Sequence, residues 1–364
     1  MQKSNRINTL DGFRFIAILL VILYHFYSRW ISHKKHISLY PYSTKYDFFL
    51  YGKLGVQFFF IISGFVIAYS LYSTPAIGQF WKKRIIRLFP PMLICSVITW
   101  LFCIFFDTKN LFWGSHRFIN LLGSLTFIDP RILNKLFSHT VQFSYTSGAY
   151  WSIWPEIQFY CIASLIYYYK PAKFFQNFSI IAMLIYVIYR VIGNIAGRNV
   201  LAIDITPSTL ALLHEWVNIF NISVYILWFL MGILFFKFYS GKYNTYTIIV
   251  FLLTLAGQFY STAIWQAKAG MMIMICLFLL FIYFPAYLEW LNYSFITKTG
   301  LASYTLYLIH ENIAIILINR YAGNWGRLDF LFPLLILAIL IAFSIFSYTY
   351  IEKPASKYLK GKFL

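Results

Sequence analysis

The chain has 364 residues, of which 60% are hydrophobic, 22% aromatic and only 11% charged, and its mean hydropathy is +0.68. A soluble protein of this length needs a more polar surface, so the composition excludes that class and predicts an all-α, polytopic membrane bundle. The net charge of +19 must lie in loops and helix ends, and its scatter between apolar segments excludes a compact nucleic-acid-binding domain.

Apolar segments recur along the chain and predict about ten membrane-spanning helices in one domain, residues 1–364. The sixth span is long enough to be broken or tilted, and segment 117–128 is too short to cross and is expected at the interface. The predicted spans are 12–31, 48–71, 88–107, 149–169, 174–194, 210–236, 245–265, 270–288, 300–319 and 330–350.

The orientation of these spans follows from the density of basic residues in the loops. Loops on the N-terminal side carry about one Lys or Arg per four residues, and those on the other side about one per seven. The positive-inside rule therefore predicts cytoplasmic N- and C-termini in a plasma (inner) membrane, with 108–148 outside. Lys3 and Arg6 precede the first span without a later cleavage pattern, so this span is expected to be retained.

The first span, LDGFRFIAILLVILYHF (10–26), carries an arginine near one end and a histidine near the other. Arg14 and His25 are eleven residues apart, which on a helix places them on one face about 16 Å apart along the axis. Arg14 alone would suit a snorkelling anchor, and His25 alone a hydrogen-bonded core residue. Ionisable residues inside spans are costly, so the pair favours a functional role. Asp11 is expected to cap this helix.

Four cysteines lie in apolar runs, so packed thiols are expected in place of disulfides. No Cys or His spacing predicts a metal site, and none is expected. The cysteines are Cys95, Cys103, Cys161 and Cys276.

Six segments, in order along nearly the whole chain, carry a family resemblance. They are residues 10–26, GVQFFFIISGF (55–65), KKRIIRLFP (82–90), YWSIWPEIQFY (150–160), SYTLYLIH (303–310) and YIEKP (350–354). On these segments the sequence resembles the acyltransferase-3 family of integral membrane acyltransferases, whose first span has a basic residue, ten residues and then histidine. That architecture also has ten spans.

The resemblance implies an enzyme that transfers an acyl group, usually acetyl, from cytoplasmic acetyl-CoA to a hydroxyl, most often on a cell-surface glycan. The family's histidine corresponds to His25, its first-span basic residue to Arg14, and its Arg-x-x-Arg motif to Arg84 and Arg87. Acetyl-CoA is then a co-substrate, and no permanently bound cofactor is expected. The SGNH-type extracytoplasmic domain that many family members carry is not expected within 1–364.

The span boundaries give an independent estimate of depth. Measured from the inner edge, His25, Glu156 and Gln57 lie at about 20 Å and His310 at about 15 Å. Such a layer of polar groups needs a water-filled or ligand-filled cavity. Glu156 is the first candidate to orient the His25 ring, with Pro155 expected to kink its span. His310 either assists or satisfies a core hydrogen bond.

Arg84 and Arg87 are i,i+3 neighbours, so on a helix they share a face. Planar guanidinium groups grip phosphate bidentately, which favours a ligand role, whereas the neighbouring lysines suit a topology anchor equally well. With Arg14 they would hold CoA phosphates at the inner edge. Histidine suits removal of a hydroxyl proton because its pKa lies near neutrality, so the thioester is expected near His25.

Three further polar residues have structural alternatives to a role in the site. Ser63 is expected to pack closely and not to act as a nucleophile. Gln57 either orients the thioester or bonds a neighbouring helix. Glu352 is expected to close a salt bridge at the inner surface. On the acceptor side, Trp113 within 108–148 fits an interface belt better than a sugar-stacking site.

The leading hypothesis is an O-acyltransferase that transfers an acyl group from acyl-CoA to a glycan or its lipid-linked precursor. An alternative is acylation of a small hydroxylated metabolite. A third, from another class, is a proton-coupled transporter with His25, Glu156 and His310 as its relay. The arginine cluster disfavours the transporter, because a proton relay needs no phosphate grip.

Overall fold

The computed structural model describes residues 7–32, 37–40, 42, 47–138, 140–198 and 207–364. Lys3 and Arg6 lie outside these residues. The longer helices are α1 (Asn8–Tyr27), α2 (Leu54–Tyr72), α3 (Ile77–Phe106), α6 (Ile153–Tyr169), α7 (Phe174–Arg198), α8 (Pro207–Ile219), α9 (Ile222–Tyr239), α10 (Thr245–Ser261), α11 (Trp265–Tyr283), α13 (Ser303–Tyr321), α14 (Phe332–Ser347) and α15 (Lys353–Phe363).

Shorter elements connect these helices. Three short α-helices are α4 (Phe118–Leu125), α5 (Pro130–Leu136) and α12 (Ser294–Leu301). Stretches of 3₁₀-helix or, for η7, π-helix are η1 (Asp47–Lys53), η2 (Trp113–His116), η3 (Gly148–Ser152), η4 (Pro171–Lys173), η5 (Pro285–Asn292), η6 (Ala322–Leu331) and η7 (Tyr348–Glu352). The strands β1 (Ile31–Ser32) and β2 (Ile37–Ser38) pair antiparallel, with Ile31 opposite Ser38.

The prediction of an all-α membrane bundle is confirmed, and each of the ten predicted segments overlaps at least one helix. Within the described residues, seven stretches are long and apolar enough to cross a membrane, and one of them, Ser303–Phe363, contains both α13 and α14. Helix α10 is apolar but shorter. Segment 117–128 forms the eight-residue helix α4.

The sixth predicted segment is broken, which is one of the two alternatives that its length allowed, since α8 ends at Ile219 and α9 begins at Ile222. The third predicted helix differs in detail from the expectation. Helix α3 begins eleven residues before the predicted boundary and continues through Pro90 and Pro91, so the basic segment 82–87 is helical. Prolines are tolerated inside such helices because neighbouring groups satisfy the freed backbone carbonyls.

The core lies where α2 packs along α9, and glycines bring the two backbones together. A Cβ atom on Gly64 would lie 2.2 Å from the Phe229 carbonyl oxygen, and one on Gly232 would lie 2.0 Å from that of Ile61. Only glycine permits this approach, which is how small residues pack membrane helices. Gly64, next to Ser63, therefore has a packing role.

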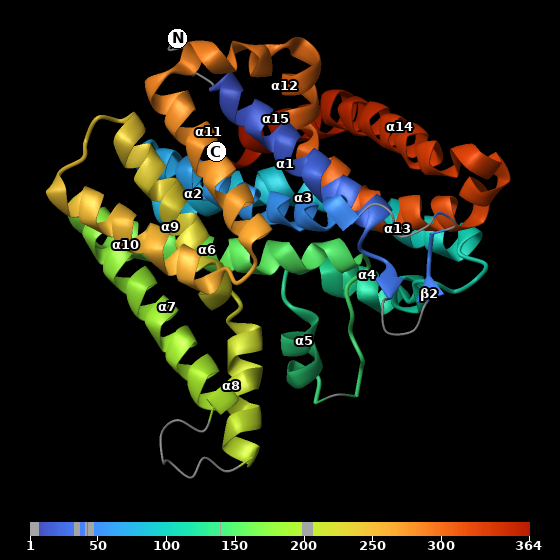
Figure 1. The fold of residues 1–364 in the computed structure, drawn as a ribbon, viewed down its shortest axis with the longest axis horizontal. Helices are drawn as coiled ribbons and strands as arrows, with labels where there is room; N and C mark the ends of the chain where they lie inside the picture. Colours follow the sequence, from blue (N-terminus) through green and yellow to red (C-terminus); the bar gives the residue numbers. More distant parts are fainter. Residues whose placement is uncertain (1–6, 33–36, 41, 43–46, 139, 199–206) are drawn as a thin grey trace.

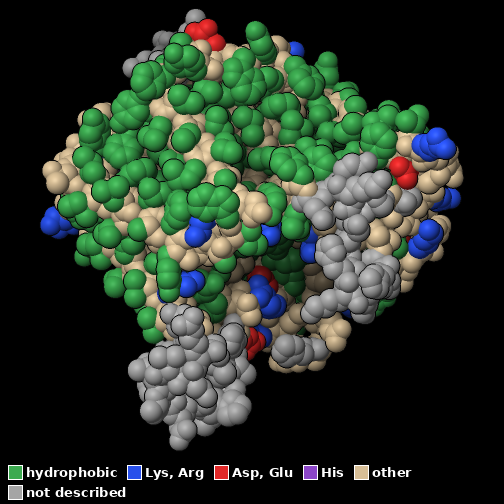
Figure 2. All heavy atoms as spheres, in the orientation of Figure 1, with side chains coloured by type: hydrophobic (Ala, Val, Ile, Leu, Met, Phe, Trp, Pro, Cys, Tyr) green, Lys and Arg blue, Asp and Glu red, His purple; other side chains and the backbone are tan. Residues whose placement is uncertain are grey.

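The helices surround this core in an arrangement visible in Figure 1, where α7 and α8 project from the lower edge and α14 lies at the right. Hydrophobic side chains cover most of the upper part of the same face, as Figure 2 shows. Residues of α14 such as Leu334 and Ile339 are about half exposed. An apolar exterior of this extent fits contact with lipid.

Three local predictions are wrong. Asp11 does not cap α1, because the helix begins at Asn8 and the Asp11 carboxylate accepts a hydrogen bond from Arg14 at 2.6 Å. Pro155 does not kink α6, because it lies in the first turn, where its missing N–H has no helical acceptor. Glu352 makes no ion pair among the described residues and accepts hydrogen bonds from Thr305 and Ser347. All four cysteines are free, as expected.

Candidate active site

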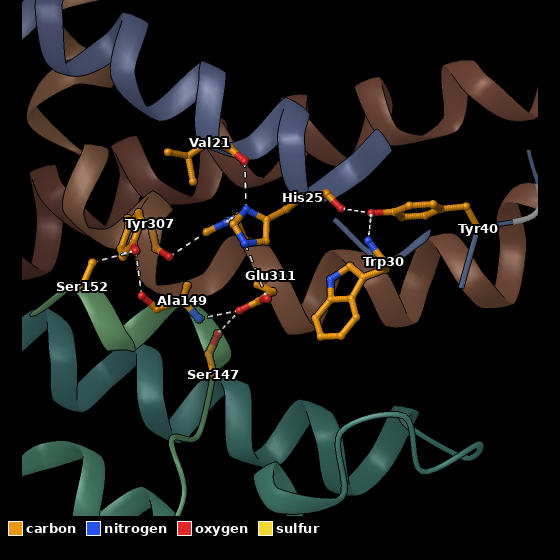
Figure 3. Close-up of polar contacts among 10 residues, drawn as sticks. Val21, His25, Trp30, Tyr40, Ser147, Ala149, Ser152, Tyr307 and Glu311 are labelled. Atoms are coloured by element: carbon orange, nitrogen blue, oxygen red, sulfur yellow. Dashed lines mark hydrogen bonds and ion pairs between the residues drawn. The ribbon is translucent and has the colours of Figure 1, made fainter. Parts of the chain in front are cut away.

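His25 lies near the end of α1, buried against α13. Its Nδ1 atom is 2.9 Å from the Val21 carbonyl oxygen and 3.2 Å from Nε2 of His310, and the two rings meet edge to face. Its Nε2 atom is 3.5 Å from Oε1 of Glu311 (Figure 3). We call His25, His310 and Glu311 the His–His–Glu cluster. His310 is 0% exposed and Glu311 2%, so water contributes little to the cluster.

The hydrogen-bond partners assign the protons of the two neutral rings. A carbonyl oxygen only accepts, so Nδ1 of His310 donates to the Tyr307 carbonyl at 2.7 Å. For the same reason Nδ1 of His25 carries the proton that faces Val21. Nε2 is then the basic nitrogen of His25, and it faces Glu311. A proton taken up at this nitrogen would form an imidazolium beside a carboxylate.

The segment before α6 holds the Glu311 carboxylate in place. Oε2 accepts the Ala149 N–H at 2.5 Å and the Ser147 hydroxyl at 3.2 Å, which leaves Oε1 facing His25 (Figure 3). Gly148 lies between these donors, where a Cβ atom would be 2.9 Å from Oε2. Two donors to a single oxygen fix the direction of the carboxylate.

The next residue of α13 anchors the same segment. Asn312 is buried and donates to the Thr146 carbonyl at 3.0 Å and to the Ser115 hydroxyl at 2.8 Å. The Ser115 hydroxyl itself donates to the Thr146 carbonyl at 2.6 Å. These bonds tie the stretch before Ser147 to α13, so the donors that hold Glu311 belong to a rigid element.

Glu156 lies elsewhere, on the wall of a narrow cavity of about 90 Å³. Its carboxylate accepts hydrogen bonds from Ser63 at 2.9 Å and from Tyr160. No contact between Glu156 and either histidine of the cluster occurs among the described residues. The carboxylate beside His25 is therefore Glu311, and the expectation that Glu156 orients this ring is corrected.

The narrow cavity opens toward a wide cavity of about 800 Å³. Arg14 of α1 and both Arg84 and Arg87 of α3 line the two cavities alike, which places the three predicted arginines where the cavities meet. The shared face expected for Arg84 and Arg87 is thus confirmed. Arg14 also bonds Asp11, whose carboxylate belongs to the wall of the wide cavity.

Arg84 is only 8% exposed, yet its charge is incompletely satisfied by protein. Nη2 donates to the Ser70 hydroxyl at 2.9 Å, and the guanidinium lies over the Phe80 ring. Its buried Nε and Nη1 atoms have no hydrogen-bond acceptor among the described residues. Buried donors that lack a partner carry a large desolvation cost, so these atoms are suited to an anionic ligand.

Tyr307 separates the narrow cavity from the His–His–Glu cluster. It lines the cavity, and its ring centroid is 5.5 Å from that of His310. Its hydroxyl donates to the Ala149 carbonyl at 2.7 Å and accepts from the Ser152 hydroxyl at 2.7 Å. A molecule that fills the narrow cavity from the arginines inward thus ends against a residue that touches the cluster.

Of the remaining candidates, Ser63 lines the narrow cavity beside Glu156. Gln57 lies on α2, and its buried Oε1 has no hydrogen-bond partner among the described residues.

Sequence reasoning missed Glu311, although the sequence contained a signal for it. His310, Glu311 and Asn312 form a run of three polar residues between apolar residues in the middle of α13, and intramembrane ionisable residues are functional candidates.

Comparisons with known proteins give the family of the chain. The family model described as an acyltransferase domain matches residues 7–348. The O-acetyltransferase OatA of Staphylococcus aureus (strain NCTC 8325 / PS 47) is 27% identical over 214 residues, which cover 55% of this chain and 32% of OatA. The O-acetyl transferase of Shigella phage Sf6 is 26% identical over 201 residues, which cover 55% of this chain and 56% of the phage protein.

These alignments cover about a third of the staphylococcal relative and about half of the phage relative. No solved structure matches the chain. The family match extends over nearly all of the described helices and includes Arg14, His25, the two α3 arginines and Glu311. The chain therefore belongs to the acyltransferase-3 family of membrane acyltransferases.

Proposed function

We propose that this protein is a membrane O-acetyltransferase that transfers an acetyl group from cytoplasmic acetyl-CoA to a hydroxyl of a cell-surface glycan or its lipid-linked precursor. Family membership and the names of the relatives, O-acetyltransferase and O-acetyl transferase, support the class of reaction. The transporter alternative loses its basis, because the family consists of acyltransferases. Arg14 near one end of α1 supports acetyl-CoA as the donor, and His25 near the other end supports a histidine as the general base.

The single observation that carries the proposal is the pairing of these two ends. At one end Arg14 lines both cavities with Arg84 and Arg87, and at the other His25 presents Nε2 to Glu311. Acetyl-CoA has phosphates at one end and a thioester at the other, joined by a thin arm. In the proposal the phosphates lie by the arginines and the arm enters the narrow cavity.

The acetyl group would then arrive at Tyr307, next to the His–His–Glu cluster. The acceptor hydroxyl gives its proton to Nε2 of His25, and its oxygen forms a bond to the thioester carbonyl carbon. The C–S bond breaks, and the departing CoA thiolate takes up the proton from His25. Glu311, whose Oε1 lies 3.5 Å from the same nitrogen, stabilises the imidazolium in between through its negative charge.

Glu156 takes a different part in this proposal from the one its sequence position suggested. It lies on the wall of the narrow cavity with Ser63 and Tyr160, at the place assigned to the arm of the donor. We propose that this group positions the thioester through hydrogen bonds. Gln57 is assigned no part in the reaction.

The proposed orientation places both termini and the wide cavity in the cytoplasm, with α5 outside. Cysteine labelling of intact cells tests it in a variant that lacks the native cysteines. A cysteine at Leu136, which is 73% exposed on α5, should react with an impermeant reagent, whereas one at Lys362 should react only after permeabilisation. The reverse pattern would put the donor site on the wrong side for acetyl-CoA.

Mass spectrometry of cell-surface glycans tests the acceptor. Cells that lack the protein should lose acetyl groups from one glycan, and wild type but not His25→Gln should restore them. Unchanged surface glycans, together with acetylation of a soluble metabolite by the purified protein, would favour the small-molecule alternative.

A further inference from the structure

The wide cavity has a wall that the proposed reaction does not use. Seven basic side chains but only two acidic ones line it. The two acidic groups are already engaged, since Asp11 bonds Arg14 and Glu352 accepts from two hydroxyls. The cavity therefore has an excess of positive charge available to an anionic ligand.

Three of these basic side chains come from α15. Lys353, Lys357 and Lys360 are spaced i, i+4 and i+7, so they share one helical face, and all three line the wide cavity. None of them makes an ion pair within the part of the chain that the structure describes. Lys362 lies on the opposite face of the same helix and does not line the cavity.

Helix α15 is held against the bundle at its far end. The Lys82 ammonium group of α3 donates to the Phe363 carbonyl at 3.2 Å. Asp11 and Arg14 of α1 line the same cavity as the three lysines. The family match ends at residue 348, so α15 belongs to a part of the chain that the family model does not describe.

The positions of the basic groups divide the cavity into two zones. Arg14, Arg84 and Arg87 lie where the wide and narrow cavities meet, whereas the α15 lysines line the wide cavity alone. The narrow cavity, at about 90 Å³, suits a thin arm, and the wide one, at about 800 Å³, has room for a nucleotide. The buried, unpartnered nitrogens of Arg84 mark the junction as an anion site.

CoA has phosphates at two places, and they fit these two zones. Its diphosphate joins the pantetheine arm to the adenosine, so it belongs at the junction. Its third phosphate is on the ribose, farther from the arm. We infer that the face of α15 formed by Lys353, Lys357 and Lys360 binds the ribose 3′-phosphate of the acyl-CoA donor. This inference rests on the proposed function, and it places the nucleotide end of the donor against α15.

Calorimetry with CoA and dephospho-CoA, which lacks only the 3′-phosphate, tests the inference. The full chain is studied in nanodiscs of neutral lipid, as wild type, as the triple variant K353Q/K357Q/K360Q and as the control K362Q. Glutamine keeps the helix propensity of lysine and removes its charge. Wild type and K362Q should bind CoA about tenfold or more tighter than dephospho-CoA. The triple variant should bind both ligands about as weakly as wild type binds dephospho-CoA.

Two results would overturn the inference while leaving the proposed function intact. One is wild type that binds the two ligands equally. The other is a triple variant that keeps the wild-type preference, which is the result expected if these lysines serve only anionic lipid headgroups. Wild type that binds neither ligand would instead contradict the proposed function.

Discussion

The sites at the two ends of α1 differ in how many of their buried polar atoms have a hydrogen-bonding or charged neighbour within the protein. At the arginine end, Arg84 has buried donors without a protein partner beside a cavity of about 800 Å³. At the histidine end, both nitrogens of His25 and both oxygens of Glu311 have a neighbour within 3.5 Å. The first arrangement fits a site that binds a ligand, and the second a site arranged in advance for chemistry.

This difference predicts that substitutions at the two ends change different quantities. Loss of a group at the histidine end should lower turnover and leave donor affinity unchanged. Loss of a group at the arginine end should lower donor affinity and have less effect on turnover at saturating donor.

Glu311→Gln is expected to have the largest effect. The amide keeps an oxygen for the Ala149 N–H but removes the charge that stabilises a protonated His25. Transfer should fall by about 10²-fold or more at unchanged CoA affinity. Glu156→Gln is the matched comparison, because that carboxylate lies in the narrow cavity, and it should reduce turnover less. Initial rates with saturating acetyl-CoA measure both, and the opposite ranking would return the orienting role to Glu156.

Arg84→Ala should weaken CoA binding by about 10- to 100-fold, because hydrogen bonds to a charged group are lost from a buried site. Arg84→Lys should recover only part of the affinity, since an ammonium group lacks the guanidinium fork. Calorimetry measures the affinities, with Gln79→Ala, at an exposed position of the same helix outside both cavities, as the control. Equal affinities in wild type and Arg84→Ala would make this arginine a structural residue.

Gly148→Ala should have the smallest effect on rate, about tenfold or less. The new methyl group would lie 2.9 Å from Oε2 of Glu311 and would push that flexible carboxylate away from its position beside His25. Stability should change little, because the displaced group is the end of a side chain. Gly193→Ala, at a position with no atom within 4 Å of the added Cβ, is the control. A Gly148→Ala enzyme with the wild-type rate would contradict this prediction and show that the Glu311 position tolerates such a shift.

The sequence predicted most of the fold and one half of the site. Helical periodicity predicted that Arg14 and His25 share a face of α1 and that Arg84 and Arg87 share one of α3. Periodicity says nothing about which faces of different helices meet. Glu156 and Glu311 are both carboxylates in apolar helices, and only the packing of α13 against α1 shows that Glu311 faces His25.

The errors at Asp11 and Glu352 have a similar cause. Both carboxylates occur at positions where a local rule assigns them a partner, but a closer tertiary partner is present. The Asp11 carboxylate accepts a hydrogen bond from Arg14, and the Glu352 carboxylate accepts hydrogen bonds from two hydroxyls of separate segments. The i, i+4, i+7 spacing of Lys353, Lys357 and Lys360 is visible in the sequence. Only the structure shows that this face of α15 lines a cavity together with residues of α1 and α3.

The central claim, that His25 acts on the proton and does not hold the donor, is tested most directly by His25→Gln. Calorimetry and transfer assays on one preparation of the full chain give CoA affinity and acetyl-transfer rate together, and glutamine keeps a hydrogen bond without a base. We predict CoA affinity equal to that of wild type and a transfer rate lower by about 10²-fold or more. A His25→Gln protein that retains most of its acetyl transfer would contradict the account.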